Sequence, residues 1–172
     1  MKLEIPKLLK GAFNQFSDER GYLNPLNLKA LLTEMNVGKF SPVLQLMSFS
    51  KCENTFRGFH YQSSPCNQAK LLLIHSGQIQ DFLVPFDDPK EAKVLTFNLE
   101  AGDILFIPDS FAHGFLTKTS DVCLQYLLDK EFNKEFYKGI NAIEYVCQFV
   151  ERDTLIASDL DRAYSKYLEL NM

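Results

Sequence analysis

The sequence predicts a single, mainly β domain, a sandwich or barrel of short strands with a short helix near each end. Between residues 45 and 127, short runs of strand-forming residues alternate with turn residues, a spacing typical of all-β domains. Fifteen phenylalanines and seven tyrosines, with no tryptophan, indicate an interior packed with aromatic rings. The 172 residues suffice for one core, and no repeat or linker divides them, so we expect one domain over residues 1–172.

The first part of the chain combines a turn with a helix. Residues 17–21 (SDERG) are typical turn residues between short apolar stretches. From residue 24 to residue 36, apolar side chains recur at helical spacing, at Leu28, Leu31, Leu32 and Met35. A short amphipathic helix is therefore expected over residues 24–36.

The middle of the chain is a series of predicted strands. They cover residues 45–50, 56–61, 70–75, 78–84, 93–99, 104–107, 114–118 and 122–127. Turn residues separate many of them, at 63–65, 76–77, 87–89, 101–103 and 108–110. Strands this short and this closely spaced form two packed sheets or a closed barrel.

The C-terminal part predicts a second helix. Ser158, followed three residues later by Asp161, fits a capping box. Leu160, Ala163 and then Tyr164 and Tyr167 continue at helical spacing. We expect this helix to pack on the β domain.

Composition excludes several classes of function. The net charge of −4 argues against a nucleic-acid partner, because phosphate binding needs concentrated lysine and arginine. No apolar run approaches the roughly 20 residues of a membrane span, and residues 1–10 lack the features of a signal peptide. The four cysteines form no CxxC pair, so we expect reduced, buried thiols and a cytoplasmic protein with no membrane partner.

The most specific local pattern runs from Gly102 through Pro108 to His113. It resembles the second motif of the cupins, in which a glycine opens a hairpin, a proline fixes the next turn and a histidine projects into the mouth of the barrel. The alternative, a turn followed by a surface histidine, explains only one of the two spacings. The pattern therefore favours a cupin-type jelly roll.

A metal site is not expected. The first cupin motif supplies two histidines one residue apart, but here His60 is followed by Gln62, a poor ligand on the same strand face. The chain has three histidines, so a three-histidine site would have to recruit His75, which falls on the other face of its own strand. We expect neither a metal nor another cofactor.

Without a metal, the barrel mouth would offer His60, Lys70, His113 and Arg57. A neutral imidazole, with an ordinary pKa of about 6.5, is a competent base at neutral pH. Lysine and a second histidine can hold negative charge on an oxygen, so the set suits removal of a proton next to a carbonyl. The alternative is that His60 is a core histidine bonded to the backbone.

Three segments together resemble the dTDP-4-dehydrorhamnose 3,5-epimerase family. They are residues 56–62 (FRGFHYQ), 68–71 (QAKL) and 107–115 (IPDSFAHGF), in the order of the family, and the likeness runs from Phe13 to about Arg162. The resemblance implies a homodimeric jelly roll whose first 45 residues or so contact the partner subunit. It also implies an isomerase for a nucleoside-diphosphate 4-keto-6-deoxy sugar, a hexose or a heptose, used for cell-surface polysaccharide.

The resemblance implies roles for the catalytic residues. His60 stands in the place of the base that removes the proton next to the 4-keto group, and Lys70 in that of the lysine that steadies the enolate oxygen. Asp161 matches the aspartate that orients the base, although it also fits the capping box. Counting back from residues 138–140 (KGI), Tyr126 matches the acid that returns the proton. The alternative for Tyr126 is a core aromatic on a strand.

The resemblance also implies a set of substrate-binding residues. Arg57 matches an arginine near the diphosphate, and Arg20 a second one that reaches the neighbouring subunit's site. A solvated turn arginine is the alternative for Arg20. The remaining members of the set are His113, Gln45, Asp81 and Tyr22.

Three departures from the family pattern concern substrate choice. Phe132 replaces a site tyrosine, Pro25 a glutamate, and Met47 stands where an asparagine is expected. They favour a related sugar, such as a heptose on GDP or another nucleotide, or inversion of C3 alone. Two further readings stay open: the 3,4-ketoisomerase branch of the sugar cupins and a non-catalytic sugar-binding cupin.

Overall fold

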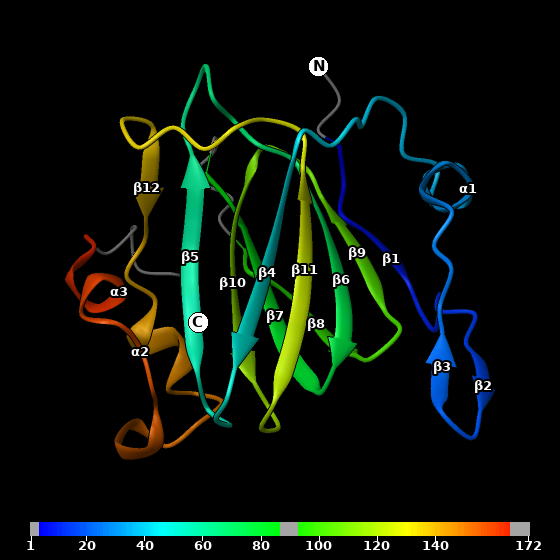
Figure 1. Cartoon of the computed structure of the whole chain (residues 1–172). Helices are drawn as coiled ribbons and strands as arrows, with labels where there is room; N and C mark the ends of the chain where they lie inside the picture. The colour runs from blue at the N-terminus through cyan, green and yellow to red at the C-terminus, as the bar shows by residue number, and fades with distance from the viewer. Residues whose placement is uncertain (1–3, 87–92, 166–172) are drawn as a thin grey trace.

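The protein is a sandwich of two antiparallel sheets (Figure 1). The computed structural model describes residues 4–86 and 93–165, and over these residues each of the two sheets has five strands. The first sheet has the order β1 (Lys7–Leu9), β9 (Ile104–Ile107), β6 (Lys70–Ser76), β11 (Val122–Leu128), β4 (Leu44–Ser50). The second has the order β12 (Tyr137–Gly139), β5 (Phe56–Gln62), β10 (Phe111–Thr117), β7 (Gln78–Pro85), β8 (Leu95–Glu100). The predicted mainly β fold is confirmed.

The predicted strands match β4 to β11 with small differences at their ends. β10 begins at Phe111, so His113 lies inside a strand and pairs with Leu83 of β7. The sequence missed β1, β12 and a hairpin made of β2 (Phe16–Asp18) and β3 (Gly21–Leu23). Each has three residues, too few for an alternation to be recognised.

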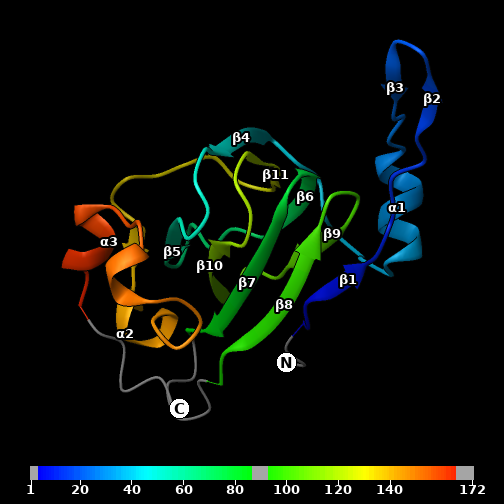
Figure 2. The ribbon, with the colours of Figure 1, turned by 90° about the horizontal axis from the view of Figure 1, so that it is seen from below.

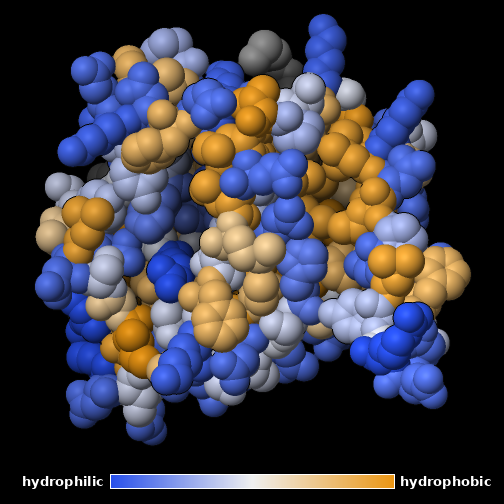
Figure 3. All heavy atoms as spheres, viewed as in Figure 1, coloured by the Kyte–Doolittle hydropathy of each residue, from blue (hydrophilic) through white to orange (hydrophobic). Residues whose placement is uncertain are grey.

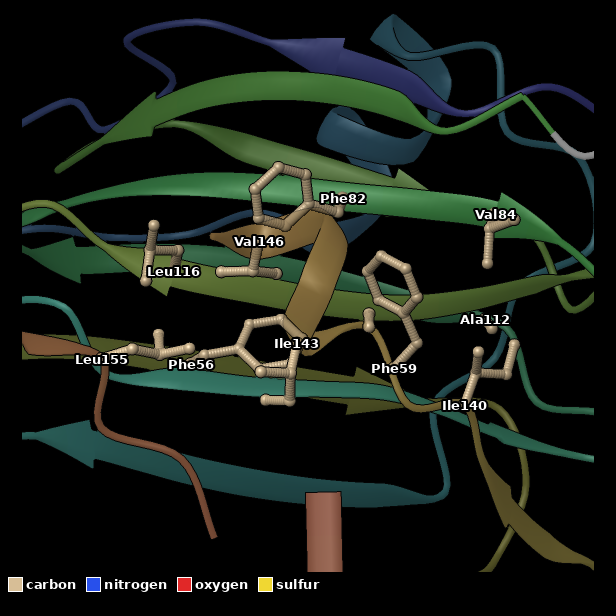
Figure 4. Packing of buried hydrophobic residues seen from close by; sticks show 11 residues of the cluster. Phe56, Phe59, Phe82, Val84, Ala112, Leu116, Ile140, Ile143, Val146 and Leu155 are labelled. Atoms are coloured by element: carbon tan, nitrogen blue, oxygen red, sulfur yellow. The ribbon is translucent and has the colours of Figure 1, made fainter. Parts of the chain in front are cut away.

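Three apolar clusters hold the fold together. The first fills the space between the sheets, where residues such as Leu72, Leu83 and Leu124 are fully buried. The second lies on the outer face of the second sheet, where α2 (Ile143–Val146) packs over Phe59 and Phe82 (Figure 4). A 3-10 turn, η2 (Arg152–Thr154), follows before the chain returns along β5 through the Thr55–Ile156 bridge.

The third cluster forms where α1 (Leu28–Glu34) covers part of the outer face of the first sheet. Leu31 and Met35 pack there with Leu71, Phe106 and their neighbours. The helix begins later than predicted, because residues 24–26 carry no helix and the side chain of Asn27 caps the first turn by accepting from the Ala30 N–H. Figure 2 shows the β2–β3 hairpin extending beyond α1, away from the sandwich.

The second predicted helix is confirmed but short. α3 (Asp159–Ala163) has Ser158 as its N-cap, with the Asp161 N–H donating to Ser158 Oγ at 3.0 Å. Tyr164, with ψ of 151°, ends the helix instead of continuing it. Tyr167, which was expected to prolong it, lies outside the described residues.

Strand β5 carries a β-bulge opposite β10. From His113 to Phe115 β10 advances two residues, while β5 advances three, from His60 to Arg57. The extra residue places Arg57 and His60 on the same face, although strict alternation would separate them. Gly58 makes this possible: its φ is 133°, and a Cβ there would overlap Gly114 Cα and lie 2.8 Å from the His113 carbonyl oxygen.

Two other features bear on the expectations from sequence. All four cysteines are free thiols, but they are not buried as predicted: Cys52 is exposed and the other three are half-buried. Among the described residues, no helix is long and apolar enough to cross a membrane.

Candidate functional site

A cavity of about 990 Å³ lies between the sheets at the end where β4 and β5 form its walls. Its polar lining includes the buried Lys70 and His113, the half-buried His60 and Tyr126, and the exposed Arg57. Its rim is apolar and includes Leu46, Phe132, Ile156 and Leu160, each about half exposed. A concave site with a few convergent polar groups and apolar walls is typical of a small-molecule site.

His60 and Asp161 form a hydrogen-bonded pair at the edge of the cavity. His60 Nε2 lies 2.6 Å from Asp161 Oδ1, and the aspartate is almost completely buried. With the hydrogen on Nε2, which donates to the carboxylate, the ring keeps a lone pair on Nδ1. His60 lines the cavity and is 28% exposed, so its free nitrogen can act as a base.

Asp161 also belongs to the cap of α3. Its second oxygen, Oδ2, accepts from Ser158 Oγ at 2.8 Å, while its backbone N–H donates to the same hydroxyl. Asp161 therefore bonds to the helix cap and to His60 at the same time. One oxygen serves the helix cap and the other faces the histidine, so the cap fixes the position of the carboxylate.

Lys70 and His113, which line the cavity, form a buried polar cluster with Asp81, which does not line it. His113 Nε2 lies 2.6 Å from Asp81 Oδ2, and Lys70 Nζ donates to the His60 carbonyl oxygen at 3.2 Å. Burial lowers the pKa of Lys70 to about 8, although the nearby carboxylate of Asp81 acts in the opposite direction. Burial also raises the pKa of Asp81, against the opposing charges of His113 and Lys70.

Tyr126 lines the cavity from the first sheet and lies next to His113 of this cluster. It comes from β11, and its ring lies edge-on to His113, with 5.8 Å between ring centroids. Burial raises the pKa of Tyr126 and the charge of Asp81 adds to this, while Arg57 opposes it. The phenol is therefore protonated at neutral pH and can donate a proton.

Gln62 has a structural role that the sequence did not reveal. Its Nε2 donates to the carbonyl oxygens of Cys66 and Glu131, and its Oε1 accepts from the Asn133 N–H at 2.6 Å. These bonds hold the backbone on both sides of Phe132. The side chain that a metal-binding cupin would use as a ligand here fixes the loop that presents Phe132 at the cavity rim.

Four predicted substrate-binding residues do not line the cavity of their own chain, and one of them, Asp81, is fully buried against His113. Gln45 lies on the outer face of β4, where its side-chain oxygen accepts from Gln125. Arg20 and Tyr22 lie on the β2–β3 hairpin, and Arg20 pairs with Asp18 at 2.5 Å. Alternation explains Gln45, because Leu44, Leu46 and Ser48 of the same strand face the cavity instead.

Among the departures from the family pattern, Phe132 lines the cavity, whereas Met47 lies exposed on the outer face of β4. His75 also lies on an outer face, with Nε2 3.0 Å from Gln125 Oε1. Among the described residues, no group of three histidine, cysteine or acidic side chains is placed to hold a metal ion.

Comparison with known proteins gives a consistent result. A sequence profile described as dTDP-4-dehydrorhamnose 3,5-epimerase matches residues 2–169. The dTDP-4-dehydrorhamnose 3,5-epimerase of Shigella flexneri is 31% identical over 145 residues, covering 81% of this chain and 79% of the relative. The crystal structure of the Bacillus anthracis enzyme of that name, with TDP and PPi bound, has a TM-score of 0.75 and 27% identity over 94% of this chain and 93% of its own.

A 3'-monoepimerase from Streptomyces bikiniensis, solved with dTDP-quinovose, has a TM-score of 0.76 and covers 97% of this chain and 86% of its own. At 18% identity this likeness concerns the fold alone. The jelly-roll architecture is therefore common to enzymes that differ in the number of carbons they invert.

We predict that Lys70 titrates near pH 8 in the folded protein. The ¹³Cε resonance of Lys70, assigned by its loss in Lys70→Met, should move with a midpoint at about 8 instead of the ordinary 10.5. Asp81→Asn should lower the midpoint further, because the carboxylate that favours the ammonium is gone. A midpoint near 10.5 in the wild type, or an upward shift in Asp81→Asn, would contradict the described electrostatics.

Proposed function

This chain belongs to the dTDP-4-dehydrorhamnose 3,5-epimerase family, and on that premise we propose how its cavity carries out the reaction. The protein is an isomerase, an epimerase of nucleotide sugars. The proposed substrate is a nucleoside-diphosphate 4-keto-6-deoxy sugar, whose C3, C5 or both are inverted by removal and return of a proton. The product would serve the synthesis of cell-surface polysaccharide.

The observation that carries the proposal is the placement of a base and an acid on opposite walls of one cavity. His60 comes from β5 of the second sheet, whereas Tyr126 comes from β11 of the first. A sugar ring held between the sheets would present one face to the imidazole and the other to the phenol. Inversion requires this arrangement, because the proton must leave from one face and return on the other.

In the first step, His60 removes the proton from the carbon next to the C4 ketone. The C–H electron pair moves into the ring to form an enolate, and the negative charge collects on the C4 oxygen. Lys70 and His113, from the buried polar cluster, would stabilise this oxygen. Asp161 keeps the hydrogen on Nε2 and balances the imidazolium that forms.

In the second step, Tyr126 donates its proton to the carbon from the opposite face, and the enolate returns to the ketone. Burial keeps the phenol protonated, and Arg57 favours the phenolate that remains after transfer. Arg57 is held at the cavity by Ser50 Oγ, 3.2 Å from its Nε, and would also pair with the diphosphate of the substrate.

We further propose that a homodimer completes the site. The β2–β3 hairpin exposes Phe16, Tyr22 and Leu23, each at least 60% exposed, and β4 exposes Met47 and Phe49 on its outer face. Hydrophobic residues also gather over this face between β4 and α1 (Figure 3). Exposed apolar surface of this kind favours a protein interface. In the dimer, the hairpin would carry Arg20 to the diphosphate in the partner's cavity.

The first test is solvent deuterium uptake. Incubated in D2O with a panel of nucleoside-diphosphate 4-keto-6-deoxy sugars, the wild type should place label at C3, C5 or both. His60→Asn should lower the rate of uptake by about 10²-fold or more, because general base catalysis is lost. Arg152→Ala, which removes an exposed ion pair with Glu144 away from the cavity lining, should keep the wild-type rate. Wild-type uptake by His60→Asn would exclude the proposed base.

Tyr126→Phe should separate the two proton transfers. The variant keeps His60, so it should still remove the proton and exchange it with D2O on the original face. It should form the inverted product about 10²-fold more slowly, since the phenol that protonates the other face is gone. Tyr145→Phe, which alters a ring packed on Phe82, provides the matched control. Unchanged formation of inverted product in Tyr126→Phe would remove this tyrosine from the mechanism.

The crossing of Arg20 predicts complementation between subunits. Arg20→Ala should raise KM by about tenfold, the effect of losing about 1.4 kcal/mol of charged hydrogen bonding, while Arg152→Ala should not. A mixture of Arg20→Ala and His60→Asn subunits should regain turnover with wild-type KM, because one cavity then has both a base and an intact partner hairpin. Failure to regain it, with mixed dimers demonstrated by mass, would place Arg20 outside the partner's site.

A further inference from the structure

Tyr164, directly after α3, packs against the catalytic pair in a way that its position in the chain does not suggest. Its ring lies 5.9 Å from the His60 ring, edge-on at 71°. The ring also occupies the space next to Gly139 of β12, where a Cβ would overlap the Cδ2, Cε2 and Cζ atoms of Tyr164. The Tyr164 ring can therefore occupy this position only because residue 139 has no side chain.

A second tyrosine, on strand β12, also packs against the His60 ring. Tyr137, two residues before Gly139, has its ring 5.4 Å from that of His60 at 44° and lines the cavity. The two tyrosine side chains interact with each other, so His60 packs against a connected pair of rings. Burial raises the pKa of Tyr137, so this phenol remains neutral at the edge of the site.

The backbone around Tyr164 is tied to the segment that follows β12. Asn141 Nδ2 donates to the Arg162 carbonyl oxygen at 2.6 Å, and the Asn141 N–H donates to the Ser165 carbonyl oxygen at 3.2 Å. The residues on both sides of Tyr164 are therefore attached to one short stretch of chain. α3 itself has five residues, and a helix this short depends on tertiary contacts for its stability.

We propose that Tyr164, seated on Gly139, is a positioning residue for the epimerase reaction. It locks α3 against β12 so that Asp161 stays on Nε2 of His60 and Nδ1 stays directed at the substrate carbon. The inference rests on the proposed role of His60 as the base. Asp161 lies on a short helix outside both sheets, so its distance from His60 depends on the contact between Tyr164 and Gly139. We call this contact the clasp.

The contact between Tyr164 and Gly139 can be disturbed without substituting a catalytic residue, although the Gly139 backbone pairs with His60 in the β5–β12 ladder. Gly139 lies in a strand and has no left-handed φ, so Gly139→Ala fits the backbone, and the three heavy atoms nearest to its Cβ all belong to the Tyr164 ring. Gly38→Ala is the matched control, because nothing lies within 4 Å of a Cβ at that position. Tyr164→Ala removes the ring, and Tyr164→Phe keeps it.

The primary measurement is the tautomer of His60, read from its ¹⁵N resonances in alkaline solution, where imidazoles are neutral. Wild type, Gly38→Ala and Tyr164→Phe should show the hydrogen on Nε2. Gly139→Ala and Tyr164→Ala should show a mixture of tautomers, and their kcat should fall about 10- to 100-fold with KM nearly unchanged. The double variant should be no worse than Tyr164→Ala, because the added methyl then has no ring to displace.

The outcomes separate this proposal from the proposed function. An Nε2–H tautomer retained in both Gly139→Ala and Tyr164→Ala would overturn the clasp, whatever the activity. A mixed tautomer in these variants, together with a wild type inactive on every sugar tested, would support the clasp and reject the function. If Tyr164→Ala loses its folded circular dichroism spectrum, Gly139→Ala decides, since it keeps both tyrosines.

Discussion

The close approach of β5 and β10 at Gly58 and Gly114 is the constraint on which the site depends. A Cβ at Gly58 would overlap Gly114, and one at Gly114 would lie 2.5 Å from the Phe59 ring. Two glycines that face each other allow the bulge that turns both Arg57 and His60 toward the cavity while Phe59 stays in the outer core. The anion-binding and proton-removing groups of the proposed site thus share one wall because of a backbone irregularity.

Two further polar groups of the proposed site come from the first sheet, which forms the opposite wall of the cavity. β6 and β11 run antiparallel through the first sheet, and their inward positions supply Lys70 and Tyr126 at the level of the bulge. His113 of β10 lines the cavity, and Asp81 of β7 supports it from outside the cavity lining. Burial acts in opposite directions on these groups, because it disfavours the charged form of each. It lowers the pKa of the Lys70 ammonium and raises that of the Asp81 carboxyl.

The sequence predicts those elements that have a regular side-chain pattern or a recognisable helix cap. Alternation gave the strands from β4 to β11, and cap chemistry located Ser158 at the start of α3. It could not find β1, β12 or the hairpin strands, because three residues are too few to show the two-residue alternation of a strand. Nor could it find the bulge, because a bulge interrupts that alternation. The motif match for Gln45 did not indicate that its side chain lies on the outer face of β4, because such a match does not say which face of a strand a residue occupies. The polar roles of Gln62 and the seat on Gly139 depend on partners distant in sequence, which a local pattern does not contain.

The strand residues and the rim residues of the cavity are held in place by different interactions. The groups proposed for proton transfer are therefore positioned separately from those proposed to select the substrate. Lys70, His113 and Tyr126 stand on strands paired on both sides, so their positions are fixed by the sheet ladders. Phe132 and Leu160 stand outside the sheets, on a loop held by Gln62 and on α3 held through Asn141. Substitutions at the rim can therefore reshape the wall around the sugar without moving the floor. Asp161 is the exception, because it contacts the proposed base His60 from α3, which lies outside the sheets. Its position therefore depends on what anchors α3, whereas the positions of Lys70, His113 and Tyr126 do not.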